Sequence, residues 1–227
     1  MIGLIIALDN ESKNLMSILK DRKTITENAF DFTTGTINGV NVVITTCGIG
    51  KVLAASATAL MIHVFKPKLI ISTGVAGGLN RSEVLDIIIA ESVVIHDFDI
   101  TLGRERGLLP IIDRVRIETD DLANCYLLEA IPNARKGIVA TGDQFIASDD
   151  IAKKIVEYFD ASACDMECGA VGYIATLNKV PFVAIKVISD SAGESAESSF
   201  MNFLLKAASI NSDAVIKVLP LLEKAYC

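Results

Sequence analysis

Residues 68–78 read Lys68-Leu69-Ile70-Ile71-Ser72-Thr73-Gly74-Val75-Ala76-Gly77-Gly78, an apolar run that ends in a cluster of glycines. A short continuous apolar run is typical of a strand buried on both faces, as in a parallel sheet. Such sheets bind ligands at the carboxyl ends of their strands, and glycines there let backbone N–H groups come close to a ligand. A tight turn without ligand contact is the alternative, since the cluster is neither a GxGxxG fingerprint nor a Walker loop.

The same order of apolar run and helical pattern repeats along the 227-residue chain. This order predicts an α/β fold: a three-layer αβα single domain, residues 1–227, with a central mixed, largely parallel sheet. Strands are expected at Ile2–Leu8, Asn41–Thr46, Lys68–Thr73, Asp86–Ile95, Lys136–Thr141 and Phe182–Ile188. Helices are expected near Glu11–Asp21, Gly50–Val64, Thr119–Ile131, Asp149–Phe159, Glu167–Leu177 and Glu197–Leu222.

The composition indicates whether to expect a nucleic-acid partner, a metal site or a membrane segment. The formal net charge is −7 and the chain has no basic stripe, so we expect no nucleic-acid partner. The five cysteines are odd in number and lack metal-ligand spacing, which predicts free thiols and no metal site. No apolar run reaches the ~18 residues of a membrane span, so we expect a cytoplasmic protein without a membrane segment.

Two further features suggest an assembly. Hydrophobic residues make up 51% of the chain, which is on the high side for a globular protein and predicts either a sheet buried on both faces or extra apolar surface buried between subunits. The segment His96–Asp121 is charged, has no clear period and is long for a connection, so we expect it to have a function.

Three carboxylates follow predicted strands or precede predicted helices. Glu11 comes just after the first strand, Glu167 precedes an apolar helix, and Asp190 ends the last strand. Each alone could be an ordinary helix N-cap or first-turn charge. Because the carboxyl ends of the strands meet at one edge of the sheet, the three together predict one site.

Seven short motifs, in this order and spacing, resemble the 5'-methylthioadenosine/S-adenosylhomocysteine nucleosidases of the purine nucleoside phosphorylase superfamily. They are Gly48-Ile49-Gly50-Lys51, Thr73-Gly74-Val75-Ala76-Gly77-Gly78, His96-Asp97-Phe98-Asp99, Gly142-Asp143-Gln144-Phe145-Ile146, Met166-Glu167, Ile188-Ser189-Asp190 and Ser199-Phe200. The resemblance implies hydrolysis of the N-glycosidic bond of methylthioadenosine, S-adenosylhomocysteine and 5'-deoxyadenosine, releasing adenine, with no cofactor and no metal.

The resemblance also implies a role for each site residue. Asp190 would protonate purine N7, Glu167 would hold the ribose hydroxyls with Met166 against the sugar, and Glu11 would deprotonate the attacking water. Phe145 would stack on adenine and Ile146 backbone groups would read its edge. The expected substrate-binding set is completed by Ile49, Val75, Lys186 and Ser189.

In that family the 5' substituent of the nucleoside sits in a pocket completed by a neighbouring subunit. The resemblance therefore implies a homodimer in which Leu102, Pro110 and Phe200 contact this substituent. We expect a structural or interface role for His96 and a packing role for His63.

Three positions depart from the commonest family pattern: Leu8 replaces Met, Val75 replaces Ser and Lys186 replaces Arg. Val75 and Lys186 are expected beside the attacking water, so the preferred 5' substituent and the rate stay open. Lys keeps the charge of Arg without its planar fork of donors.

Three other functions stay open. A nucleoside phosphorylase of the same fold would need cationic phosphate ligands, whereas the first strand is followed by the acid Glu11. Hydrolysis of another purine nucleoside, including a futalosine-like compound, fits the same motifs. A non-catalytic nucleoside-binding protein is the third, and the presence of all three acids argues against it.

Overall fold

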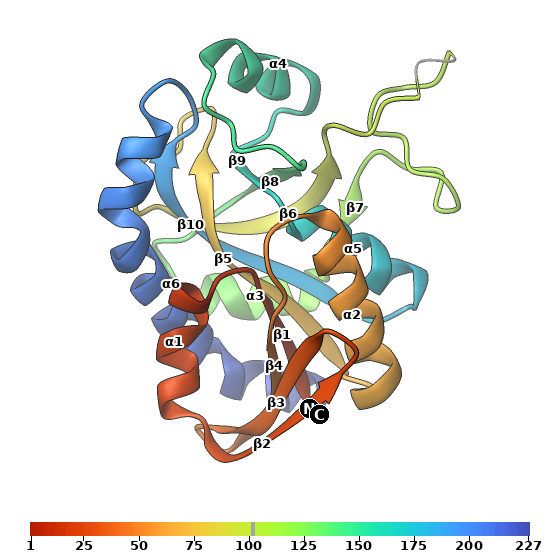
Figure 1. Ribbon diagram of the computed structural model, residues 1–227, viewed down its shortest axis with the longest axis vertical. Helices are drawn as coiled ribbons and strands as arrows, with labels where there is room; N and C mark the ends of the chain where they lie inside the picture. The colour runs from red at the N-terminus through yellow and green to blue at the C-terminus, as the bar shows by residue number, and fades with distance from the viewer. Residues whose placement is uncertain (101–102) are drawn as a thin grey trace.

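The computed structural model describes residues 1–100 and 103–227, and their backbone forms one mixed sheet with helices on both faces (Figure 1). Leu102, expected at the 5' substituent, lies outside the described residues. The strands are β1 (Ile2–Ile6), β2 (Lys20–Glu27), β3 (Phe30–Ile37), β4 (Val40–Thr46), β5 (Leu69–Gly78), β6 (Ile87–Ile95), β7 (Ile117–Glu118), β8 (Arg135–Thr141), β9 (Ala163–Asp165) and β10 (Phe182–Ser191). The helices are α1 (Asp9–Ile18), α2 (Lys51–Phe65), α3 (Asp121–Ala130), α4 (Asp149–Phe159), α5 (Cys168–Leu177) and α6 (Ala196–Tyr226).

Parallel pairs form the centre of the sheet. Strands β4, β1, β5 and β10 lie side by side in parallel, and each is apolar and buried along nearly its whole length. Beyond them β5, β10, β6, β8 and β9 each pair with the next, and β9 pairs back to β5, so these strands close into a ring. The expected mixed α/β sheet is confirmed, and the carboxyl ends of β1, β5 and β10 meet beside this ring.

A hairpin widens the sheet where the sequence analysis expected the end of a helix at Asp21 and named no strand before Asn41. Helix α1 ends at Ile18, and β2 and β3 then pair antiparallel with each other and with β4. Asn38 and Gly39 both have positive φ, 51° and 84°, as a two-residue hairpin turn between β3 and β4 requires. The overlooked signal is this Asn-Gly pair after the alternating Phe30–Ile37 run.

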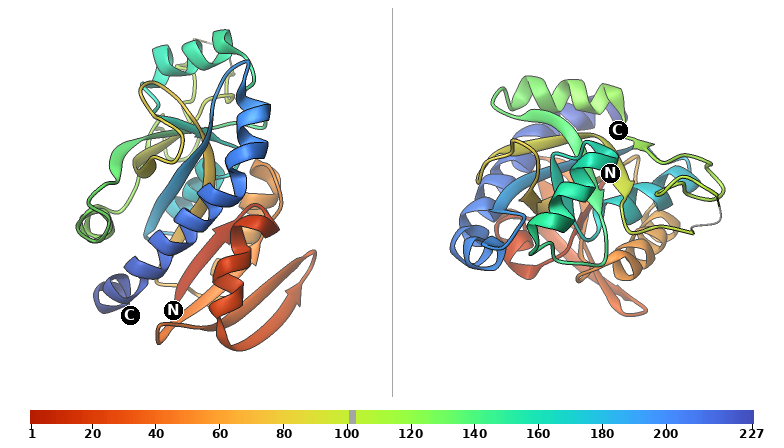
Figure 2. Two further views of the ribbon diagram at one scale, coloured as in Figure 1. Left: turned by 90° about the vertical axis from the view of Figure 1, so that its left-hand side faces the viewer. Right: turned by 90° about the horizontal axis from the view of Figure 1, so that it is seen from above.

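Helices cover the two faces in separate groups, as two views at right angles show (Figure 2). One core joins the sheet to Leu15 of α1, Leu127 of α3 and Val215 of α6. The other joins it to Met61 of α2 and Val171 of α5. The three-layer architecture is therefore confirmed. His63 differs from expectation: it lies exposed on α2 and does not pack into the core.

The segment that follows β6 projects from the sheet and returns at β7, which pairs with β6 (Figure 1). An isolated bridge joins Leu109 and Arg114, and the Tyr173 hydroxyl of α5 donates to the Pro110 carbonyl. Ile111, at the turn of this bridge, is 84% exposed. Within residues 1–100 and 103–227, no helix combines the length and the apolar composition that crossing a membrane requires.

Candidate active site

A cavity of about 120 Å³ lies at the carboxyl ends of β1, β5 and β10, where the sequence analysis expected the site. It brings together all three predicted carboxylates and most of the predicted contacts. Its lining residues are Ala7, Leu8, Glu11, Ile49, Val75, Ala76, Gly77, Phe145, Cys164, Asp165, Met166, Glu167, Ser189, Asp190 and Phe200.

Glu11 is held by the backbone on both carboxylate oxygens. It lies in the first turn of α1, and its Oε2 accepts from the Leu8 N–H at 2.8 Å while Oε1 accepts from the Val75 N–H at 2.7 Å. Gly74 makes this approach possible, since a Cβ there would lie 2.5 Å from Oε1. Burial raises the pKa of Glu11 and outweighs these hydrogen bonds and the charge of Lys186, so this carboxylate is a better proton acceptor than an exposed one.

Glu167 precedes α5 and accepts a hydrogen bond from the Gly50 N–H at 2.9 Å. Burial and the neighbouring charge of Asp165 raise the pKa of Glu167 to about 7, against the lowering influence of Lys186 and Gly50. Gly50 stands directly before α2, so the carboxylate faces the positive end of that helix dipole. The structure thus places a buried carboxyl group in the cavity lining.

Asp190 is aimed into the cavity by an irregularity in β10. Ile188 pairs with Ala76 and Asp190 pairs with Gly77, so Ser189 is an extra residue in the strand. The Ser189 hydroxyl donates to Asp190 Oδ2 at 2.8 Å. Burial raises the pKa of Asp190, against this hydrogen bond, and a raised pKa favours the protonated form that a general acid needs.

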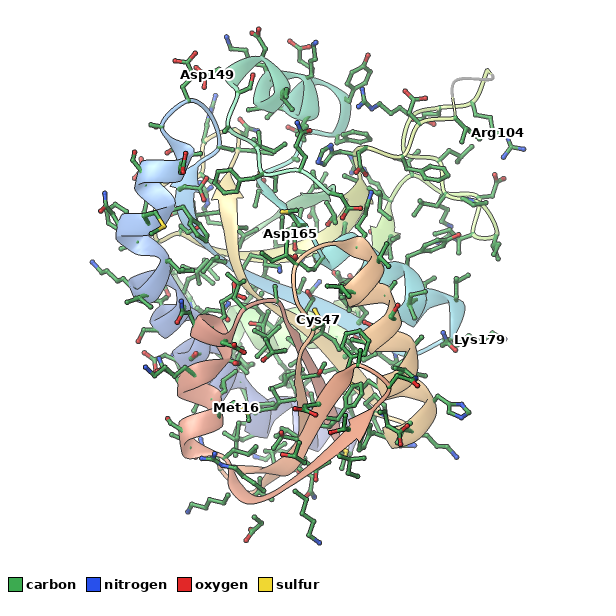
Figure 3. The ribbon with its side chains drawn as sticks, in the orientation of Figure 1. Met16, Cys47, Arg104, Asp149, Asp165 and Lys179 are labelled. Atoms are coloured by element: carbon green, nitrogen blue, oxygen red, sulfur yellow. The ribbon has the colours of Figure 1, made fainter. Side chains whose placement is uncertain are left out.

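Asp165 and Lys186 form a buried ion pair beneath the cavity, 2.8 Å from Nζ to Oδ2. Asp165 also accepts from the Thr141 hydroxyl at 2.5 Å and from the Cys168 N–H at 3.0 Å. Figure 3 labels Asp165 in the middle of the molecule. Lys186, predicted to contact substrate, is therefore engaged with Asp165 and is not among the described residues that line the cavity.

The predicted base contacts divide into two groups. The rings of Phe145 and Phe200 meet edge to face, with centroids 5.8 Å apart, at the mouth of the cavity. The Ile146 side chain instead packs in a core cluster with α4, and its carbonyl accepts from the Gly193 N–H at 3.2 Å. Pro110 is exposed and lies outside the cavity of its own subunit.

Three contributors escaped the sequence analysis. Ala7 and Cys164 line the cavity, and Asp165 anchors Lys186, although nothing in the residue types alone distinguishes them from core positions. For Asp165 the available signal was its place between an apolar strand and Glu167. An acid in such a buried position requires a partner.

The arrangement can protonate a leaving group, hold a polar ring and activate water within one small apolar-walled space. The three predicted carboxylates come from α1, the residue before α5 and β10, and Asp165 of β9 is a fourth carboxylate in the lining. None of the described lining residues is Lys, Arg or His, so the cavity provides no cation for a phosphate nucleophile.

Known proteins are similar to this chain over nearly its whole length. The family model of the phosphorylase superfamily matches residues 1–220. A 5'-methylthioadenosine/S-adenosylhomocysteine nucleosidase of Shewanella loihica is 35% identical over 96% of this chain and 98% of its own.

Solved structures agree as well. The Neisseria meningitidis nucleosidase of the same name, in complex with methylthio-immucillin-A, superposes with a TM-score of 0.93 at 30% identity, over 96% of this chain and 97% of its own. A futalosine hydrolase of Helicobacter pylori has a TM-score of 0.93 at 28% identity and covers 97% of both chains. The chain therefore belongs to the phosphorylase superfamily and, within it, to the 5'-methylthioadenosine/S-adenosylhomocysteine nucleosidases.

Proposed function

We propose that the protein hydrolyses the N-glycosidic bond of 5'-methylthioadenosine, S-adenosylhomocysteine and 5'-deoxyadenosine, releasing adenine and the 5-substituted ribose. The observation that carries the proposal is the meeting of Glu11, Glu167 and Asp190 around one cavity of about 120 Å³. Relatives of that name, 34–35% identical over nearly their full length, support the choice of substrate.

In the proposed reaction the bond from the sugar to the purine breaks as the purine accepts a proton. Asp190 donates this proton to N7, and burial, which raises the pKa of Asp190, favours the protonated form. Glu167, as a carboxylate, accepts hydrogen bonds from the ribose hydroxyls and stabilises the positive charge that develops on the sugar. Glu11 accepts a proton from the attacking water while Leu8 and Val75 hold its oxygens in place.

Aromatic and backbone groups would select the base. Phe145 and Phe200, which already contact each other, would enclose the purine ring from the mouth of the cavity. The Ile146 carbonyl has a second lone pair besides the one engaged by Gly193, and with the Ile146 N–H it would read the amino-substituted edge of adenine. Inosine, which lacks that amino group, should be a poor substrate.

The test is to mix the protein with methylthioadenosine, S-adenosylhomocysteine, adenosine and inosine, with and without phosphate, and to measure free base and sugar products. We expect adenine and free sugar, at a rate that phosphate does not increase. Recovery of a sugar 1-phosphate would assign a phosphorylase. Release of no base from any of the nucleosides would favour a binding protein.

Futalosine hydrolysis is a second candidate, because the Helicobacter pylori futalosine hydrolase superposes with the same TM-score of 0.93. Adding futalosine to the same assay decides between them. A kcat/KM for futalosine above that for methylthioadenosine would reverse our assignment.

We also propose that the protein works as a cytoplasmic homodimer. Ile49, Val52 and Leu53, at and after the start of α2, are 54%, 74% and 41% exposed. Helix α5 packs on α2, and Tyr173 of α5 holds Pro110. A partner placed on this face would bury the apolar side chains and would lie beside Ile49 at the cavity, where Pro110 could reach the 5' substituent.

A further inference from the structure

Three loops at the mouth of the cavity are tied together by Lys51, Asp97 and Asp143, which we call the loop clamp. Lys51 begins α2, Asp97 follows β6 and Asp143 follows β8. Asp97 Oδ1 pairs with Lys51 Nζ, and Asp97 Oδ2 accepts from the Asp143 N–H at 2.9 Å. Asp143 in turn accepts from the Lys51 N–H at 2.7 Å. None of the three lines the cavity described above.

Each of the three loops that the clamp joins contains or leads to a residue of the proposed site. The residue before Lys51 is Gly50, whose N–H holds Glu167 at 2.9 Å. Two residues after Asp143 comes Phe145, whose ring meets Phe200. Asp97 opens the segment that leads to Pro110. One cluster therefore fixes the sugar-binding carboxylate, the base-stacking ring and the segment assigned to the partner subunit.

Hydrogen bonds at the loop clamp join the start of α2 to residues that are distant in the sequence. The first N–H groups of α2 have no partners within the helix, and here Glu167 and Asp143 accept from Gly50 and Lys51 across 117 and 92 positions of the chain. Both acceptors are carboxylates at the positive end of the helix dipole. Asp97 then neutralises Lys51 and satisfies the next free N–H, that of Asp143.

The buried side chain of His96 packs against the backbone next to the loop clamp. His96 is 3% exposed, and its ring packs so closely on Gly142 that no Cβ would fit there. The Arg106 Nε–H donates to the His96 carbonyl at 2.9 Å. These contacts fix the backbone next to Asp97 and Asp143. The ion pair between Lys51 and Asp97 then fixes the start of α2 relative to that backbone.

We infer that Asp97 is a positioning residue: it holds the Gly50 and Phe145 loops at the separation at which Glu167 and the aromatic ring engage the same nucleoside. The inference rests on the proposed nucleosidase reaction. Because a misplacement of about 1 Å by a residue remote from the chemistry can lower a rate by about 10²-fold, loss of the clamp should reach the reaction.

Asp97→Asn tests this, since the amide keeps the size of the side chain but removes its charge and one acceptor. Lys51→Met removes the ion pairs of Lys51, to Asp97 and at 3.8 Å to Asp143, but leaves the backbone hydrogen bonds, and it is the alternative if Asp97→Asn does not fold. Asp86→Asn is the matched control, because Asp86 likewise combines an ion pair, to Arg135 at 3.4 Å, with acceptance from a backbone N–H, that of Glu83. Asp86 is not among the described residues that line the cavity.

We expect kcat/KM for methylthioadenosine to fall by about ten-fold or more in Asp97→Asn, toward the 10²-fold limit, and to stay within about two-fold in Asp86→Asn. The acid limb of the pH profile of Asp97→Asn should also move upward. The reason is that the Gly50 N–H lowers the pKa of Glu167 and would be less firmly placed.

Two results would overturn the inference. One is a wild-type kcat/KM and pH profile in Asp97→Asn, with a loss of thermal stability equal to that of Asp86→Asn. The other is a loss of activity fully explained by dissociation of subunits in sedimentation. Failure of the proposed function looks different, since the unmodified protein would then release no adenine from methylthioadenosine.

Discussion

The Lys186 ammonium lies 2.8 Å from the Asp165 carboxylate, and the two side chains are 3% and 1% exposed. Such a pair is a poor source of net stability, but removal of one partner leaves an uncompensated buried charge. Both members of the pair act on two carboxylates of the proposed site, Glu11 and Glu167: Lys186 lowers the pKa of each, and Asp165 raises it. The pair is thus a fixed dipole beside the site, in which the charge of Asp165 opposes that of Lys186.

Lys186→Met should therefore destabilise the protein by about 3–5 kcal/mol, measured by urea unfolding. Arg135→Met is the control, since Arg135 pairs with Asp86 at the surface, at 46% and 33% exposure, where such pairs contribute about 0–1 kcal/mol. Equal losses in the two variants would show that the buried pair has no special energetic role.

Asp190→Asn should abolish turnover and preserve nucleoside binding, because the amide keeps the shape but carries no proton for the leaving purine. The expected fall in kcat is about 10²–10⁴-fold. Calorimetry with methylthioadenosine measures the binding. A variant that kept more than about a tenth of the wild-type rate would disprove the general-acid role of Asp190.

Glu167→Gln should make thermal stability less dependent on pH. The pKa of Glu167 is about 7 in the folded protein and near 4.5 when exposed, so the folded state binds more protons between these values. Stability from this group is therefore lost as pH rises through about 7. We expect a higher Tm than wild type at pH 8 and a difference that narrows toward pH 4.5. A constant difference across that range would contradict the assignment, and Glu105→Gln, at an exposed carboxyl, is the control.

Gly74→Ala should remove activity by displacing Glu11, since the new Cβ would lie 2.5 Å from Oε1 at a residue whose φ is +149°. Gly39→Ala is the matched control, with φ of +84° and open space around the new carbon. Both variants should lose some stability through backbone strain. Comparable rates of adenine release would show that the position of Glu11 is not critical.

Val52→Glu should dissociate the proposed homodimer, because a charge would replace an apolar side chain that is 74% exposed on α2. Leu122→Glu, at a leucine 51% exposed on α3, should leave it intact. Sedimentation measures the outcome. A monomeric wild-type protein with full activity would remove the shared site from our proposal and leave the catalytic acids unaffected.

The predictable part of the fold follows from local pattern. Continuous apolar runs such as Leu69–Thr73 and the periodic helices between them mark the central strands and all six described helices. Strand β9 could not be found this way, because its three residues become a strand only by pairing with β5 and β8. Helix α1 was extended too far because β2 is exposed and polar, without an apolar alternation to reveal it.

The site residues, like the fold, were predictable where local sequence position was sufficient and not where distant contacts decide. Position at a strand end was enough to bring Glu11 and Asp190 together, since parallel strands place their ends at one edge. The engagement of Lys186 with Asp165 was out of reach, because it depends on how β10 and the end of β9 face each other in the folded chain. Contacts between distant elements carry no local signature.

The ring of strands also sets the order in which the molecule can become functional. The Ser189 hydroxyl of β10 reaches the Ala76 carbonyl of β5 across 113 positions of the chain, and such distant pairings form slowly. Until β10 is synthesised, β5 and β6 each lack one of their pairing strands, and unpaired strand edges invite aggregation. Asp190 arrives on the strand that pairs with both, so a nascent chain acquires its proposed general acid only with the strand that covers these two edges.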